Sequence, residues 1–278
     1  SAAACDSANG NEPDAPIESG NPADTVPTDT IPQITPPEQK PQGLDSVLIP
    51  EGLELVDYTP YTGPVGPLSE NFRPIYVDGR RWSRVMVWEK QTRDNRYYTE
   101  EVTGNVDLDV AIAKKLRHRP DFYPDLYDTW DYLVEDGGIV YEGCPGELYY
   151  FNGELKRHWS LKTLYDVFPS ESNELTSRLC AVQAKIISRG IMTLRGRQLR
   201  AAKVKIDKLM YNRIQYDYWV EGIGSLFGFI IDNNPIYTMF TGGRFDLLVQ
   251  CVDKNGQLIY DYRDFDPDLY EELEILSE

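Results

Sequence analysis

The chain has 278 residues with 41% hydrophobic and 12% aromatic content, which is enough apolar surface for a globular core. Its formal net charge is −17 at pH 7, and most of that charge lies at the two ends. Residues 1–45 carry eight acids against Lys40 alone, and residues 264–278 carry seven acids and no base. An acidic chain lacks the lysine and arginine excess that phosphate binding needs, so the composition excludes a general nucleic-acid-binding protein.

The N-terminal segment has the composition of a signal remnant followed by a tether. The letters SAAAC place small residues directly before Cys5, as at the end of a bacterial lipoprotein signal. This predicts that residues 1–4 are a signal-peptide remnant and that Cys5 carries a lipid such as palmitate; an ordinary cleavage site or an unmodified thiol is the alternative. Residues 6–45 contain eight prolines and no aromatic residue, so they cannot bury enough apolar surface to fold. We expect residues 5–45 to be a lipid-anchored tether and residues 46–278 to be one β-rich domain.

From Arg80 onward the chain alternates strand patterns with glycine turns. RRWSRVMVWEK alternates along a pleated strand, and Ala202, Val204 and Ile206 alternate with lysines further on. Hairpin turns are predicted at Gly104-Asn105, Asp136 to Gly138, Cys144 to Gly146, Asn152-Gly153 and Asn255-Gly256. The pattern predicts an all-β antiparallel fold, either a sandwich or an open roll or barrel, with a short C-terminal helix starting near Pro267.

The stretch YWVEGIGSLFGF, residues 218–229, contains three closely spaced glycines. A dinucleotide-binding loop needs a helix after its glycines, and a P-loop needs Gly-Lys-Ser/Thr. Here a further strand-like run follows instead, so we expect a strand, a kink and a return strand. The structural motif consists of Glu221, Gly222, Gly224, Ser225 and Gly228.

The motif W-x-E-G-I-G-S-x-x-G, with the two hairpin regions YLVEDGGIVYEGCPGELYYF and TEEVTGNVDLDVAIAKKL, resembles uncharacterised secreted proteins and lipoproteins of Bacteroidetes. The resemblance covers roughly residues 80–262. It implies a cell-envelope location and a β fold, and the family offers no established catalytic residues to carry over.

The sequence contains few candidates for catalytic or metal-binding residues. Asp217 and Glu221 lie four residues apart, which along a strand separates them by about 13 Å, too far for a glycosidase pair without a kink. No C-x-x-C pair exists, and His118 and His158 are forty residues apart, so we expect no zinc site, no other metal and no cofactor. Neither histidine has an evident partner, and no catalytic residue is predicted.

Two sets of residues are candidates for ligand binding. The first is an aromatic stretch that could stack on sugar rings or peptide, or cover one end of the β core: Phe122, Tyr123, Tyr127, Trp130 and Tyr132. The second is a basic set that could bind an anion or dock an acidic terminus, or form the solvated face of a sheet: Arg189, Arg195, Arg197, Arg200, Lys203 and Lys205.

The sequence predicts an outer-membrane lipoprotein, periplasmic or surface-exposed, that acts as a non-enzymatic binding module for carbohydrate or protein. The alternatives are a polysaccharide hydrolase, whose carboxylates would converge in a cleft, and a structural subunit of a surface assembly. A structural subunit would show a long unpaired strand edge or a large apolar patch.

Overall fold

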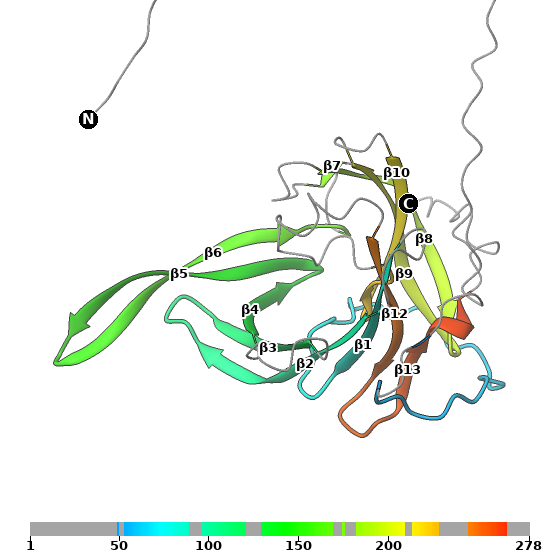
Figure 1. Cartoon of the computed structure of the whole chain (residues 1–278), viewed down its shortest axis with the longest axis horizontal. Helices are drawn as coiled ribbons and strands as arrows, with labels where there is room; N and C mark the ends of the chain where they lie inside the picture. The colour runs from blue at the N-terminus through cyan, green and yellow to red at the C-terminus, as the bar shows by residue number, and fades with distance from the viewer. Residues whose placement is uncertain are drawn as a thin grey trace, which may run out of the picture. The chain divides into compact units, whose positions relative to one another are not determined.

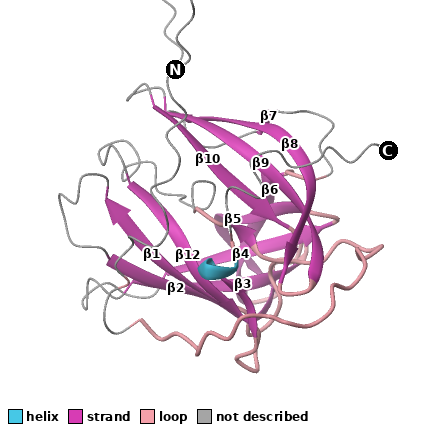
Figure 2. Cartoon of the chain, turned by 90° about the vertical axis from the view of Figure 1, so that its right-hand side faces the viewer, coloured by secondary structure: helices cyan, strands magenta, loops and turns pink. Residues whose placement is uncertain are grey.

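The computed structural model describes residue 49 and residues 53–88, 96–120, 129–168, 174–175, 182–208, 213–227 and 244–265. The tether, Cys5 and the predicted C-terminal helix lie outside these residues. The structure has the predicted antiparallel all-β fold, with two sheets that do not close into a barrel (Figures 1 and 2). No helix among the described residues has the length and hydropathy needed to span a bilayer.

Thirteen strands and one 3₁₀ turn make up the described fold. Their bounds are β1 Arg81–Trp88, β2 Arg96–Asp107, β3 Ile112–Pro120, β4 Thr129–Asp136, β5 Ile139–Phe151, β6 Glu154–Tyr165, β7 Glu174–Leu175, β8 Val182–Leu194, β9 Arg197–Lys208, β10 Arg213–Val220, β11 Gly224–Ser225, β12 Arg244–Val252, β13 Leu258–Asp261 and η3 Tyr262–Asp264.

Each sheet is mainly a meander. The eight-stranded sheet has the order β13-β12-β1-β2-β3-β4-β5-β6, and the five-stranded sheet has the order β11-β10-β9-β8-β7. The chain therefore completes six neighbouring strands, builds the second sheet, and returns with β12 to pair antiparallel with β1. That return places β12 next to β1 and β13 next to β12.

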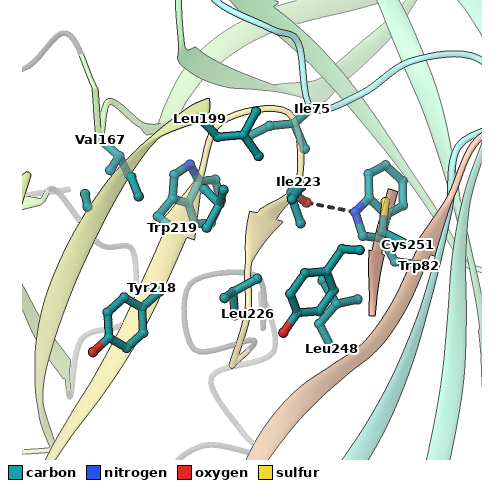
Figure 3. Close-up of a cluster of buried hydrophobic side chains, with 14 of the residues drawn as sticks. Ile75, Trp82, Val167, Leu199, Tyr218, Trp219, Ile223, Leu226, Leu248 and Cys251 are labelled. Atoms are coloured by element: carbon teal, nitrogen blue, oxygen red, sulfur yellow. Dashed lines mark hydrogen bonds between the residues drawn. The ribbon is translucent and has the colours of Figure 1, made fainter. Parts of the chain in front are cut away.

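One apolar core lies between the sheets. Trp82 and Leu248 come from the eight-stranded sheet, and Leu199 and Trp219 come from the five-stranded sheet. The turn residue Ile223 joins them in the same cluster, and all five side chains are almost completely buried (Figure 3). Burial of this kind supplies the main stabilising term for a two-layer β fold.

The turns are partly as predicted. The turns at Gly137-Gly138 between β4 and β5, at Asn152-Gly153 between β5 and β6, and at Asn255-Gly256 between β12 and β13 are confirmed. Asn152 and Gly153 both have positive φ, as a two-residue hairpin turn requires.

Two predicted turns are wrong. Gly104-Asn105 lies inside β2, where the register with β3 shifts, and the chain instead turns after Asp107, with Asp109 at a φ of 63°. Cys144 to Gly146 lies inside β5, where the register with β6 shifts between Pro145 and Leu148. Glycine in a strand pattern marks a bulge as well as a turn, and sequence alone does not separate the two.

Candidate functional site

The glycine motif forms a strand, a tight turn and a return strand, as predicted. β10 ends at Val220, and β11 pairs antiparallel with it, placing Gly224 opposite Val220. Gly222 and Gly224 have φ values of 71° and 94°, in the region that favours glycine. Ser225 ends β11 rather than opening a helix, so the loop has no helix N-terminus for a phosphate. Gly228 lies outside the described residues.

Backbone carbonyl groups of this turn bind side chains that come from β1 and the residue before it. The indole Nε1 of Trp82 donates to the carbonyl oxygen of Ile223 at 2.8 Å (Figure 3). Arg84 donates to the carbonyl of Ser225 at 3.0 Å, and Arg80 donates to the carbonyl of Gly222 at 2.7 Å. These bonds link one sheet to the other, so the motif has a structural role.

The two carboxylates near the motif are fully buried and bonded internally. Asp217 accepts from the hydroxyl of Ser225 and from the backbone N–H of Phe227 at 2.9 Å. Burial raises the pKa of Asp217 to about 6, and these hydrogen bonds act in the opposite direction. An acid in this environment is not exposed to a ligand.

Glu221 is also enclosed. Its carboxylate accepts from the backbone N–H of Arg73 at 2.7 Å and from the backbone N–H of Arg200 at 2.8 Å, and it pairs with the guanidinium of Arg200 at 3.0 Å. The side chain of Glu221 has no exposed surface. It fixes the irregular segment 53–80 against β9, so it does not form a glycosidase pair with Asp217.

A row of charged side chains crosses four strands on the core face of the larger sheet. Arg84 on β1 contacts Glu100 on β2 at 2.9 Å, and both are buried. The other Glu100 oxygen lies 3.2 Å from Nδ1 of His118 on β3, and Nε2 of His118 lies 2.8 Å from Asp131 on β4. The expectation that His118 has no partner is therefore wrong.

The charges in this row stabilise one another. Burial opposes ionisation of His118, but hydrogen bonds and the negative charges of Asp131 and Glu100 raise its pKa to about 10. Burial likewise opposes ionisation of Glu100, but Arg84 and His118 lower its pKa to about 2. At neutral pH the row is an alternating series of charges, which is the arrangement of a structural ion network.

The opposite, outer face of the same sheet carries a cluster of aromatic and basic side chains. We define the outer aromatic surface as Lys115, Arg117, Trp130, Tyr132 and Trp159. Strand pairing places Arg117 opposite Trp130 and Lys115 opposite Tyr132. The ammonium of Lys115 lies 3.8 Å from the centre of the Trp130 ring, and the Tyr132 and Trp159 rings meet edge to face at 5.1 Å.

A small buried group of apolar residues lies beside Tyr132 on this face. Leu108 and Ala113 are fully buried, yet they do not belong to the main core cluster. Gly143 gives the rings room, because a Cβ there would lie 2.6 Å from Leu108 and 3.2 Å from Tyr132. Trp130 remains 37% exposed, so one large ring of this face is presented to solvent.

The structure brings part of the predicted aromatic set together. Trp130 and Tyr132 lie on one face of β4, whereas Phe122, Tyr123 and Tyr127 lie outside the described residues. Trp159 was missed in the sequence, because placing it beside Tyr132 requires the register shift between Pro145 and Leu148. An alternating β6 pattern, as in KRHWSLK, is the signal that could have suggested it.

The predicted basic residues lie on the β8–β9 hairpin, and four of its arginines make internal bonds. Arg195 pairs with Asp264 at 3.0 Å, and Arg197 donates to the carbonyl of Ile259. Arg189 donates to the carbonyl of Val167, and Arg200 pairs with Glu221 as described. Anion binding by this set stays a prediction, while the Arg195–Asp264 pair shows one acid of the C-terminal stretch held by the hairpin.

The two lysines of the basic set are not equally exposed. Lys203 is buried, with its ammonium 4.9 Å from the centre of the Tyr216 ring. The basic residues of this strand therefore do not form a fully solvated face. Lys205 is partly buried on the same strand. The lysines therefore do not form one continuous exposed patch.

The described residues contain neither a disulfide nor a group of side chains that could hold a metal ion. Within the described residues Cys144 and Cys251 form no disulfide, and Cys180 lies outside them. Within the described ranges, no group of three histidine, cysteine, aspartate or glutamate side chains is arranged to hold a metal ion.

The fold and the site together define a two-sheet antiparallel β protein with an aromatic and basic outer face. Comparison of the chain with family models, curated proteins and solved structures finds no match.

Proposed function

We propose that the protein is a lipid-anchored binding protein of the cell envelope that holds a carbohydrate on its outer aromatic surface. The observation that carries this proposal is Trp130 on β4, a partly exposed ring with the Lys115 ammonium over one face, 3.8 Å from its centre. A sugar ring presents an apolar C–H face to such an aromatic ring and hydroxyl groups to neighbouring charged side chains. Lys115 supplies such a donor beside the ring, and so does Arg117, whose guanidinium also pairs with Glu101.

The anchor is Cys5, on the sequence grounds given above, and the proline-rich tether would hold the β domain away from the bilayer. A coil of about 40 residues spans roughly 35 Å, which is enough to present the outer aromatic surface to ligands beyond a membrane. We place the protein at the outer membrane, facing either the periplasm or the cell surface.

Non-enzymatic binding is favoured over hydrolysis because the two carboxylates in and beside the glycine motif make structural bonds inside the protein. Asp217 and Glu221 are fully buried and saturated with internal partners. A hydrolase would need an exposed acid and base facing the same sugar. Incubating the protein with any polysaccharide it binds, and measuring released reducing ends, distinguishes the two functions.

A glycan array with the full 278-residue chain tests the proposal. We expect binding to a restricted set of glycans, and we expect Trp130→Ala to weaken it by about tenfold or more, since a central aromatic contact is worth roughly 1–2 kcal/mol or more. Tyr61→Ala is the matched control, because Tyr61 is 45% exposed but lies outside this surface. If the protein bound no glycan on the array, or if Trp130→Ala bound as tightly as the wild type, the proposal would be contradicted.

A structural subunit of a surface assembly is a second candidate function, and a specific feature favours it. β6 is the last strand of the larger sheet, and exposed apolar side chains lie at the end of the β5–β6 hairpin.

A further inference from the structure

The β5–β6 hairpin extends beyond the rest of its sheet. β4 pairs with β5 from Asp136 opposite Ile139 to Leu133 opposite Glu142. Beyond that point the described pairing of β5 is with β6 alone, as far as Phe151 opposite Glu154. Figure 1 shows this part as a two-stranded ribbon that leaves the sheet. We call residues 144–159 the arm.

One face of the arm carries uncovered apolar side chains. Tyr150 and Leu155 are directly opposite each other in the register, and Leu148 lies two residues from Tyr150 on the same face. Their exposed fractions are 77%, 55% and 53% respectively. A two-stranded ribbon is marginal in water, and large apolar side chains gathered on it indicate a contact surface.

The two edges of the arm differ. The β5 edge contains Pro145, which has no N–H to donate, and a register shift between Pro145 and Leu148. Both features discourage the pairing of a further strand. The β6 edge from Glu154 to Tyr165 contains no proline and lies at the end of the sheet. The β6 edge is therefore the one suited to accept another strand.

The β6 sequence is complementary to itself. When two identical strands pair antiparallel about a twofold axis through one residue, positions equally far before and after that residue face each other. With the axis at Leu155, the two Leu155 side chains meet, and Glu154 of each copy faces Lys156 of the other. Because β6 begins at Glu154, this register pairs residues 154–156 of each copy. An axis at Glu154 or at Lys156 would instead place like charges directly opposite, which is destabilising.

We propose that two copies of this chain associate through the β6 edges of their arms, paired antiparallel about Leu155. The result is a short four-stranded ribbon at the tips of the two arms, in the order β5-β6-β6-β5 and over residues 154–156 of each β6. In it, Leu155 and Tyr150 of both copies form one apolar strip. Two Glu154–Lys156 pairs flank the axis on the opposite face. This contact specifies how a structural subunit would assemble, and it does not depend on carbohydrate binding.

Cysteine cross-linking tests the register. Side chains directly opposite in an antiparallel pair have Cβ atoms about 4.5–5.5 Å apart, so Leu155→Cys should form a covalent dimer under mild oxidation after small adjustments. Tyr150→Cys is the matched control: it is more exposed, but two intervening strands separate the two copies by roughly 14 Å in the proposed ribbon. The unsubstituted chain gives the background from native thiols.

If covalent dimers formed only through random collisions, the more exposed Tyr150→Cys would give the higher yield. We therefore expect at least fivefold more dimer from Leu155→Cys than from Tyr150→Cys. Equal yields, or no dimer from Leu155→Cys above background, would overturn the proposal.

Charge exchange tests the same contact without a cysteine. Glu154→Lys would place a lysine opposite Lys156 at each of the two symmetric contacts, and Lys156→Glu would place a glutamate opposite Glu154 at each of them. Each single change should weaken dimerisation by about tenfold, and the double exchange should restore it to within about threefold. Sedimentation velocity at low salt gives the dissociation constants, and circular dichroism confirms that each variant is folded.

A monomeric wild-type chain at every concentration, or a double exchange as weak as the single changes, would overturn the proposal. The glycan array tests the surface around Trp130, whereas these experiments test the contact at residues 154–156, so failure of either experiment leaves the other interpretable.

Discussion

At the scale of single residues, His118 shows how the fold uses charge. It lies between Glu100 and Asp131, and both of its ring nitrogens face a carboxylate. The sequence did not reveal these partners because the turn was predicted at Gly104-Asn105. That turn would pair Glu100 with Asp109, whereas the bulged β2 and the later turn pair Glu100 with His118. A turn predicted at the wrong residues gives the wrong register, so every cross-strand contact derived from it is wrong as well.

His118→Gln should destabilise the protein in a pH-dependent way. The folded-state pKa of about 10 lies above the ordinary value of 6.5, so the imidazolium stabilises the fold fully below pH 6.5 and loses this effect as pH rises through 10. We expect Gln to lower the free energy of unfolding by about 2–4 kcal/mol at pH 6, because Glu100 loses one of its buried positive partners. The difference between variant and wild type should shrink steadily towards pH 10.

Urea denaturation at pH 6, 8 and 10 measures this difference, with His158→Gln as the control. His158 stacks on Tyr149 in the arm and has no part in the ion row. The control should change the free energy of unfolding by less than about 1 kcal/mol. A His118→Gln deficit that stays constant or grows with pH would contradict the assignment.

Glu100 and Asp217 shift the stability in opposite directions at acid pH. The lowered pKa of Glu100, about 2, means that its stabilising effect is present above pH 4.5 and is lost as pH falls towards 2. The raised pKa of Asp217, about 6, means that its neutral form favours the fold below pH 3.8, and this effect is lost as pH rises through 6. The fully charged ion row and a partly neutral Asp217 therefore coexist at mildly acidic pH.

At the scale of elements, the short β10–β11 turn determines how the two sheets are joined. Its outline could be predicted, because three glycines between strand-like runs indicate a kink and a return strand. Its partners could not, because Trp82, Arg84 and Arg80 are more than 130 residues away in the sequence. Carbonyl groups of a tight turn accept from whichever donors the tertiary fold provides, and local patterns carry no information on them.

Gly222→Ala compared with Gly153→Ala measures the tertiary role of this turn. Both glycines have positive φ, 71° and 78°, so each alanine incurs a backbone cost of roughly 1–2 kcal/mol. A Cβ at Gly153 meets nothing within 4 Å, whereas a Cβ at Gly222 would lie 3.3 Å from the Cβ of Arg73, whose backbone is bound by Glu221. We expect Gly222→Ala to lower the free energy of unfolding by about 1 kcal/mol more than Gly153→Ala.

Chemical denaturation of the two variants gives both values. If Gly222→Ala were no more destabilising than Gly153→Ala, the turn would depend on its φ angles alone, and its contacts with the segment 53–80 would contribute little.

At the scale of the whole molecule, the fold class follows from the sequence and the sheet order does not. Alternating strands with glycine turns predict antiparallel meanders, and consecutive strands are neighbours from β1 to β6 and from β7 to β11. The return of β12 to the edge of β1 is a contact between distant segments, and no turn signal encodes it. The same limit applies to the outer aromatic surface, which joins β4 to β6 across β5.

The two faces of the larger sheet carry different sets of side chains. Its core face holds the ion row and the apolar cluster that bind the second sheet. Its outer face presents Trp130, Tyr132 and Trp159. We therefore attribute stability to the residues of the glycine motif, and our proposal assigns ligand binding to residues outside that motif.

The most direct test of this division is a nuclear magnetic resonance titration of the tryptophan indole N–H signals with the glycan that binds best on the array. The chain has five tryptophans. Our account predicts that the signals of Trp130 and Trp159 shift on binding, while those of Trp82 and Trp219, which are buried in the core, stay in place. Binding that moves the Trp82 or Trp219 signals and leaves Trp130 and Trp159 unchanged would contradict it.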